Sequence, residues 1–321
     1  MQQKRQRAFI LRMGDLHELI RRHGLELARA QAVTRGQRAA VDAAGDVLAE
    51  EVSRLGITHA GFAMTALPHK RFDERVWRRE GPQTILLVES GSNDNGALLG
   101  VPYGSIARLI LLYLQTEAIR TNSPEVELGR SMNTWLGRMG LTIGGRTYKL
   151  VAEQARRISA CRLTFFTSHT PGLRHRQNGA FVQDEITMTG LADRRQPTIW
   201  QDRVRLDDAF WRSLRKHPVP VREEAIKAIG TRSLAIDIYI WLAYRLHVLD
   251  RPTPVSWSSL HAQFGQGFRH AYDMKPRFRE AMAIALAVYP EARVTEIDGG
   301  ITLYPSPSAI PAAEARRLGL G

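Results

Sequence analysis

A helix predicted after Gly145 would have one apolar side and one cationic side. With a turn of about 100° per residue, its apolar side holds Tyr148, Val151, Ala155 and Ile158. The opposite side holds Glu153 among basic residues, which are Arg146, Lys149, Arg156 and Arg157. Arg and Lys side chains on such a face can bind DNA phosphates and the edges of guanine in the major groove. The alternative is an ordinary solvated basic face. The place of this helix in the fold must distinguish between these two interpretations.

Two other basic clusters could make similar contacts. The loop predicted after the next strand carries Arg174, His175 and Arg176, and cations there would lie against the DNA backbone or minor groove. An ordinary exposed loop explains this loop equally well. The second cluster precedes or opens a later helix and consists of Arg269, His270, Lys275 and Arg277. We expect it to contact phosphates, while direct reading of bases by that helix has less support because Lys275 lies nearer its apolar side.

The elements that must position these clusters occur in one order twice. The first set is a helix over 105–120, a short extended piece over 126–128, helices over 130–139 and 147–160, and strands over 162–167 and 181–188. The second set is a helix from Ser233, a helix over 256–264, a helix starting near Pro276, and a hairpin at Asp298-Gly299. This order is typical of a winged helix, which favours DNA binding by the helix after Gly145.

The two sets also match in spacing. Ser105-Ile106-Ala107 corresponds to Ser233-Leu234-Ala235, and Gly137 corresponds to Gly265 at the same offset. Two anchors at one offset indicate an internal duplication, although chance similarity between amphipathic helices is the alternative. Trp241 and Phe278 each lie on an apolar helical stripe of the second set, so we expect both to be buried.

We therefore predict an α+β, helix-rich fold with tandem winged-helix domains and a helical N-terminal extension. The extension and its linker would occupy residues 1–82. The first winged-helix domain would occupy 83–206, and the second, with a short C-terminal tail, 207–321. Residues 61–82 are rich in Pro, Gly and charged residues, and we predict that they form a connector. A chain of 321 residues suits two domains of ordinary size.

Charge points to the class of partner. The chain has 45 Lys and Arg against 32 Asp and Glu, a net charge of +13. Such an excess favours a polyanion, with nucleic acid first and an anionic membrane second. The longest apolar run, Leu109–Leu114, is too short to span a bilayer, and the apolar part of the first residues is too short for a signal peptide. We therefore expect a cytoplasmic protein without a membrane partner.

Signatures of enzymes and of metal sites are absent from the sequence. The segment Gly91–Gly96 lacks the lysine of a phosphate-binding loop, and there is no histidine–hydrophobe–histidine pair. Acidic pairs such as Asp207-Asp208 are typical of solvated helix faces. The single cysteine, Cys161, allows no internal disulfide and is expected to be a small core residue. We predict no catalytic residue, no metal and no cofactor.

Several longer motifs resemble one known family. They are Leu67–Arg71 (LPHKR), Trp77–Gly81 (WRREG), Val101–Arg108 (VPYGSIAR), Leu114–Thr121 (LQTEAIRT), Ser233–Tyr239 (SLAIDIY), Trp241–Leu246 (WLAYRL) and Tyr289-Pro290. Together they resemble the RepA-type replication initiators of bacterial plasmids. The resemblance covers about residues 65–307.

The resemblance implies a function in plasmid replication and copy control. Proteins of this family bind repeated double-stranded sites at the origin, help to open an adjacent AT-rich segment, and recruit the host initiator and the replicative helicase. They often repress their own promoter as homodimers, and no catalytic residue is carried over from them. The alternatives are a transcriptional repressor that uses the same modules, and a nuclease or transposase, against which the missing metal cluster argues.

Overall fold

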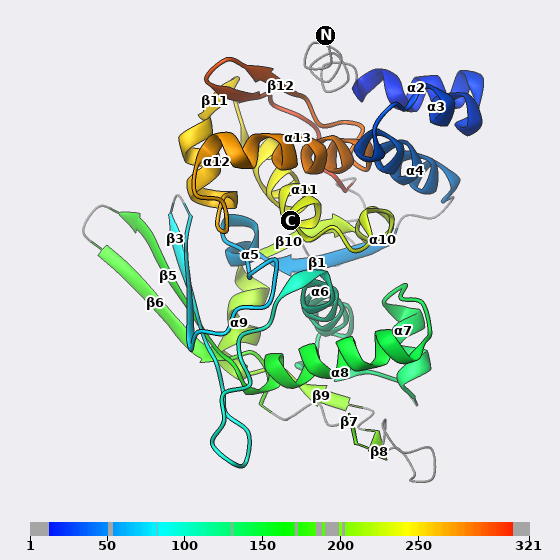
Figure 1. Ribbon diagram of the computed structural model, residues 1–321. Coiled ribbons are helices and arrows are strands. Elements are labelled where there is room, and N and C mark those ends of the chain that lie inside the picture. The colour runs from blue at the N-terminus through cyan, green and yellow to red at the C-terminus, as the bar shows by residue number, and fades with distance from the viewer. Residues whose placement is uncertain are drawn as a thin grey trace. The chain divides into compact units, whose positions relative to one another are not determined.

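The chain crosses twice between two units, each with its own core. In this computed structural model the described residues are 13–50, 54–81, 83–129, 131–170, 173–183, 188–189, 199–200 and 203–310. One unit comprises Met1–Gly56 with Val219–Gly321, and the other comprises Ile57–Pro218. Both contain helices and strands (Figure 1), so the predicted α+β class is confirmed. The crossings lie at β1 (Leu55–His59) and β10 (Pro218–Arg222).

The unit 57–218 is built around α6 (Gly104–Thr121), whose Ile110, Leu114 and Ala118 are fully buried. After α6 come β4 (Glu125–Glu127), α7 (Met132–Arg138) and α8 (Gly145–Ala160). The hydroxyl of Ser131 caps α7 by accepting a hydrogen bond from the N–H of Thr134. Helix α8 packs against α6. The order of elements predicted for this region is therefore present, with α8 starting two residues earlier than expected.

An antiparallel sheet follows α8 in this unit. It has the order β2 (Val76–Glu80), β3 (Thr84–Glu89), β5 (Arg162–Thr170) and β6 (Leu173–Ala180). In β3 every second residue is buried, and Leu86 pairs with Phe165 of β5 on the buried face. Strand β2 and the short helix α5 (Ala60–Met64) lie in the predicted connector. The sequence pattern did not predict β2. On the buried side of that strand Trp77 is the only apolar residue, and the other buried residue is Arg79.

Smaller elements complete the unit. Strand β9 (Arg203–Arg205) pairs with β4, and β7 (Met188–Thr189) pairs with β8 (Ile199–Trp200). Helix α9 (Asp208–Lys216) is capped by Asp207, whose carboxylate accepts hydrogen bonds from the N–H groups of Ala209 and Phe210. Because a carboxylate also favours the positive end of a helix, this cap explains why α9 begins there.

In the other unit, the second set of elements has the same order. Helix α11 (Ser233–Arg245) and a 3-10 turn (Leu246–Val248) are followed by β11 (Thr253–Ser256), α12 (Trp257–Phe264), α13 (Ala271–Ala287), β12 (Val294–Ile297) and β13 (Gly300–Leu303). The strands pair in the order β11-β13-β12. Trp241 and Phe278 are buried, 5% and 1% exposed, and both rings contact the ring of Phe264. The predicted core positions are confirmed.

The N-terminal helices α2 (Met13–His23), α3 (Leu25–Gln31) and α4 (Arg35–Ala49) belong to this same unit. Helix α4 packs against α13 and against α10 (Glu223–Ile229). His17 Nε2 lies 2.6 Å from the carbonyl oxygen of Ala287, at the end of α13. The segment predicted as an extension over 1–82 is thus divided between the two units. A sequence pattern cannot show this, because α4 pairs with a helix more than 200 residues away in the chain.

Two predicted boundaries are wrong. Helix α13 begins at Ala271 rather than near Pro276, so Pro276 lies inside the helix. Proline there removes the hydrogen bond to the carbonyl of Tyr272, and because Pro276 is exposed, that carbonyl can bind water instead. Strand β6 begins at Leu173 rather than at residue 181. Its polar sequence looked like a loop. No helix in the described part of the chain is long and apolar enough to cross a bilayer.

Candidate nucleic-acid interface

Helix α8 is anchored by the apolar side that the sequence predicts. Val151, Ala155 and Ile158 are fully buried. Tyr148 is half-buried, and its hydroxyl donates a hydrogen bond to the side chain of Asn133 on α7. Burial of these residues fixes the rotation of α8 about its axis, and therefore determines which of its side chains face outward.

Three of the predicted cations lie on the outward side. Arg146, Lys149 and Arg156 are exposed. None of them forms an ion pair with another residue in the part of the chain that the structure describes. Their charge is therefore not neutralised by a neighbouring carboxylate, which favours attraction of a polyanion.

The start of α8 is open. A Cβ atom added at Gly144 or Gly145 would have no atom within 4 Å, and the first turn of α8 has neither a side-chain cap nor an acidic residue. The N–H groups of that turn have no partner within the helix, and the helix dipole adds positive potential there. The electrostatic potential at the start of α8 is therefore positive, and Arg146 and Lys149 add to it.

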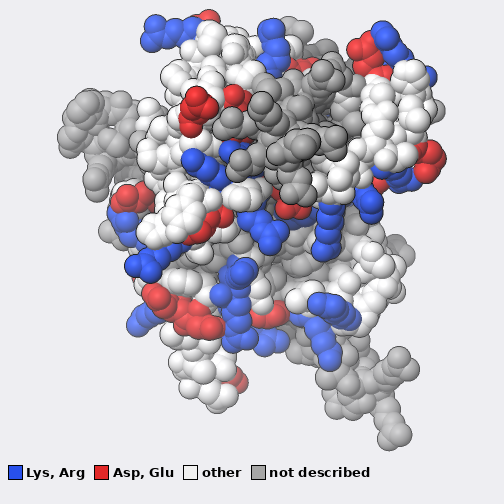
Figure 2. Space-filling view, turned by 45° about the horizontal axis from the view of Figure 1, so that its top comes forward, with Lys and Arg blue, Asp and Glu red and all other residues white. Residues whose placement is uncertain are grey.

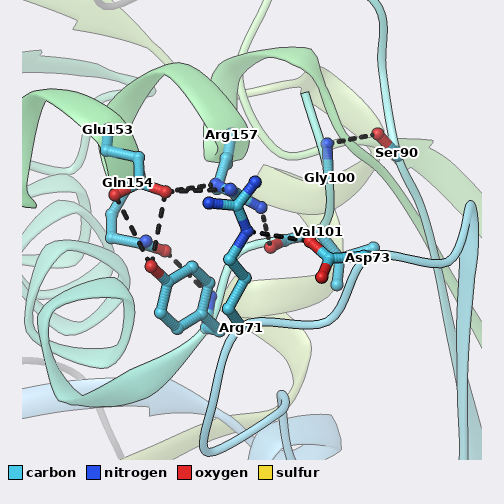
Figure 3. A network of polar contacts seen from close by, with 9 residues as sticks. Arg71, Asp73, Ser90, Gly100, Val101, Glu153, Gln154 and Arg157 are labelled. Carbon is cyan, nitrogen blue, oxygen red and sulfur yellow. Dashed lines mark hydrogen bonds and ion pairs between the residues drawn. The ribbon is translucent and has the colours of Figure 1, made fainter. Parts of the chain in front are cut away.

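The prediction is wrong for Arg157, because this residue does not lie on the exposed side of α8. It is 5% exposed, and its Nη1 donates to the carbonyl of Val101 at 3.1 Å (Figure 3). Its Nη2 lies 2.8 Å from Oε1 of Glu153, and its guanidinium lies 5.0 Å from the ring centre of Tyr103. Burial of a charge requires such partners. Arg157 therefore ties α8 to residues 101–103.

The same segment makes two further contacts with α8. The N–H of Tyr103 donates to Oε1 of Gln154 at 2.8 Å, and the Tyr103 hydroxyl donates to Glu153 (Figure 3). Gly100 has a φ of +83°, and a Cβ there would collide with Nη1 of Arg157. Glycine is thus required for the close approach of this segment to α8.

Arg71 is a cation near this face that the sequence analysis did not select. Its pKa is raised, first by a hydrogen bond from its Nε to Asp73 at 2.8 Å and further by the nearby charge of Glu153. Figure 3 shows its side chain beside the Glu153–Arg157 network. The signal in the sequence was the charge cluster His69-Lys70-Arg71, which had been assigned to a connector.

The cations of the hairpin lie in a strand and not in a loop. Arg174, His175 and Arg176 belong to β6, where His175 pairs with Thr167 and Arg176 with Phe166. The side chains of these three residues are outside the described part of the structure. The structure brings their backbone next to β5, directly after α8.

Some of the predicted cations of the second unit already contact other side chains. Arg269 and His270 are exposed immediately before α13. The amine of Lys275 lies 5.1 Å from the ring centre of Trp257, and Arg277 lies 3.6 Å from Glu280 in an ion pair. The pattern of the sequence did not select Tyr272, which is 66% exposed and whose ring stacks on that of His270.

Basic residues extend beyond α8 and α13. On the face drawn in Figure 2, Lys and Arg side chains recur across the surface with Asp and Glu among them. Within the described residues, no three His, Cys, Asp or Glu side chains are placed to hold a metal ion. Cys161 is buried, and burial raises the pKa of its thiol to about 12. The thiol is therefore protonated at neutral pH and unsuited to nucleophilic chemistry.

Comparison with known proteins gives one family. The family described as "Plasmid encoded RepA protein" matches residues 101–258, which contain α6, α8 and α11. No curated protein matches the chain.

Two solved structures are similar at low identity, and both contain domains 2 and 3 of RctB. A selenomethionine derivative is 10% identical, with 79% of this chain and 97% of that chain covered and a TM-score of 0.47. A crystal structure of RctB 155–483 is 12% identical, with 75% and 93% covered and a TM-score of 0.43. At these scores, neither likeness establishes a shared fold or function.

Proposed function

We propose that this chain is a replication initiator of the plasmid RepA type, the family whose model matches residues 101–258, and that it acts by binding double-stranded DNA at repeated sites of a plasmid origin. The observation that carries the proposal is the outward side of α8, where Arg146, Lys149 and Arg156 are exposed without a carboxylate partner among the described residues. Such a face, anchored by a buried apolar side, can enter the major groove while the unit stays folded.

We further propose that each unit contains a winged-helix module. The order helix, strand, helix, helix, strand, strand supports this for α6 to β6 and for α11 to β13. A shared detail supports a duplication: Ser131 and Ser256 each cap the second helix of a set through the N–H three residues later. Helices α8 and α13 would then be the recognition helices.

The roles of individual residues follow from their positions along α8. Arg146 and Lys149 lie in its first turns, from which recognition helices contact base edges. Arg156 lies two turns further along and would contact phosphate. The hairpin of β5 and β6 would reach the DNA backbone or minor groove with Arg174 and Arg176. In the second module, Arg269 and His270 would bind phosphates from the turn before α13.

The later steps of initiation are proposed from the family alone. They are opening of an AT-rich segment, recruitment of the host initiator and the replicative helicase, and repression of the protein's own promoter by a homodimer. None of these steps requires the protein to make or break a covalent bond, and we propose that the chain is not an enzyme. A transcriptional repressor without initiator activity would use the same α8 contacts and is the second candidate.

A maintenance assay separates the two candidates. The gene and its neighbouring repeats are placed on a plasmid without another origin. We expect the wild type to maintain this plasmid and a double variant, Arg146→Ala with Lys149→Ala, to lose it while remaining folded. Loss of the plasmid with the wild-type gene, together with intact sequence-specific DNA binding, would favour the repressor.

A salt titration tests the mode of binding. Each phosphate neutralised on duplex DNA contributes about −0.9 to the slope of log K against log salt concentration. Two modules should contact several phosphates, so a steep negative slope is expected. A slope near zero would mean that the exposed cations do not contact the DNA backbone.

A further inference from the structure

Two large apolar side chains lie exposed beside the cations of α8. Leu150 is 37% exposed, and Ile143, in the turn before the helix, is 57% exposed. Leu150 follows Arg146 by four residues and Lys149 by one. Residues four apart lie on the same face of a helix, so Leu150 shares the outward face with Arg146.

Packing within the chain does not explain why these two apolar side chains lie exposed. The buried side of α8 is formed by Val151, Ala155 and Ile158, and the turn next to Ile143 is open, because a Cβ atom at Gly144 would have no neighbour within 4 Å. Single exposed apolar residues are common on protein surfaces. Here, however, both flank the same open end of one helix, among cations that attract a polyanion.

We infer that Leu150, together with Ile143, contacts the 5-methyl group of thymine and so helps to determine which DNA sequence the protein prefers. This inference rests on the proposed function, since it requires α8 to enter the major groove. Thymine carries the one apolar group that the bases present in that groove. Arg146 and Lys149 draw the helix to the DNA, and contact with the methyl group then removes the apolar surface of Leu150 from water.

The test uses thymine and its analogue without the methyl group. Purified full-length protein selects its preferred duplex from a random-sequence pool. Each thymine of that duplex is then replaced singly by deoxyuridine. For the wild type we expect at least one replacement to weaken binding about threefold to fivefold, the factor that corresponds to one buried methyl group.

The variant Leu150→Ala identifies the side chain responsible. In this variant, the loss of affinity at that thymine should disappear, while losses at other positions stay. Leu27→Ala is the matched control, because Leu27 is a helical leucine of similar exposure, 44%, in α3. It should keep the wild-type pattern, and circular dichroism should show that both variants are folded.

Other outcomes would overturn either the inference or the proposed function. The inference is overturned if no thymine shows a methyl-dependent loss with the wild type, or if Leu150→Ala keeps every loss. It is also overturned if Leu150→Ala binds every duplex normally but no longer maintains the plasmid, since the apolar residues would then serve a protein partner. If the pool yields no preferred sequence, the proposed function itself fails.

Discussion

Replacing Arg157 with alanine tests whether this arginine is structural. The variant loses a charged hydrogen bond to the buried carbonyl of Val101, which contributes about 1.5–3 kcal/mol. It also loses the contact with the Tyr103 ring, about 0.5–1 kcal/mol. The ion pair with Glu153 adds little, because the Glu153 side chain is 35% exposed and its charge is screened. The expected loss of stability is therefore about 3 kcal/mol.

Arg156→Ala is the matched control, because the two residues are adjacent and only Arg157 is buried. In urea unfolding followed by circular dichroism, we expect Arg157→Ala to unfold at a lower urea concentration and Arg156→Ala to unfold like the wild type. In a DNA titration, Arg156→Ala should bind more weakly. The reasoning is refuted if Arg157→Ala is as stable as the wild type and loses DNA affinity as Arg156→Ala does.

Three more predictions follow from buried groups. Trp241→Ala or Phe278→Ala should each lower the free energy of unfolding by about 3–5 kcal/mol, and an unchanged melting temperature would refute the packing. Burial, with a smaller effect from His217, lowers the pKa of His59 from 6.5 to about 3. Between these values the unfolded chain binds the proton more readily, so stability should be full above pH 6.5 and fall toward pH 3. His59→Gln should flatten this profile, and an unchanged slope would contradict it. The Cys161 thiol, with its pKa raised to about 12, should react with a thiol reagent only after unfolding; rapid reaction of the native protein would contradict its burial.

The parts of the fold that the sequence predicted are those with strong local patterns. The apolar spacing of α8 and α11, the short helix predicted over 256–264 and the Asp298-Gly299 turn each depend on residues close together in the chain. Local rules are sufficient for such elements. They identified the helix–strand order of the two predicted sets of elements and the buried positions of Trp241 and Phe278.

The errors arise where distant parts of the chain override a local pattern. Strand β6 has almost no apolar residue, and its pairing with β5 defines it. Pro276 marks a helix start by local preference, yet α13 starts at Ala271. Arg157 looked exposed on a helical wheel, but Val101 and Tyr103, more than fifty residues earlier, supply the partners that allow it to be buried. The division of residues 1–82 between two units depends on similar long-range packing.

The sequence predicted which side of α8 faces outward, and the structure corrects that prediction at Arg157, which is buried. The charge pattern of α8 was sufficient to select Arg146, Lys149 and Arg156. It was not sufficient to find Leu150, because an exposed leucine is recognised only when its neighbours in space are known.

The central claim is that α8 reads DNA sequence, and a competition titration of Arg146→Ala tests it most directly. The variant and the wild type are each titrated with the selected duplex and with a scrambled duplex, with circular dichroism as the control for folding. The account predicts that Arg146→Ala loses about 1–3 kcal/mol of binding to the selected duplex, relaxes the sequence preference at one position, and changes little on the scrambled duplex. If the folded variant binds both duplexes as the wild type does, α8 is not the reading helix and the claim is contradicted.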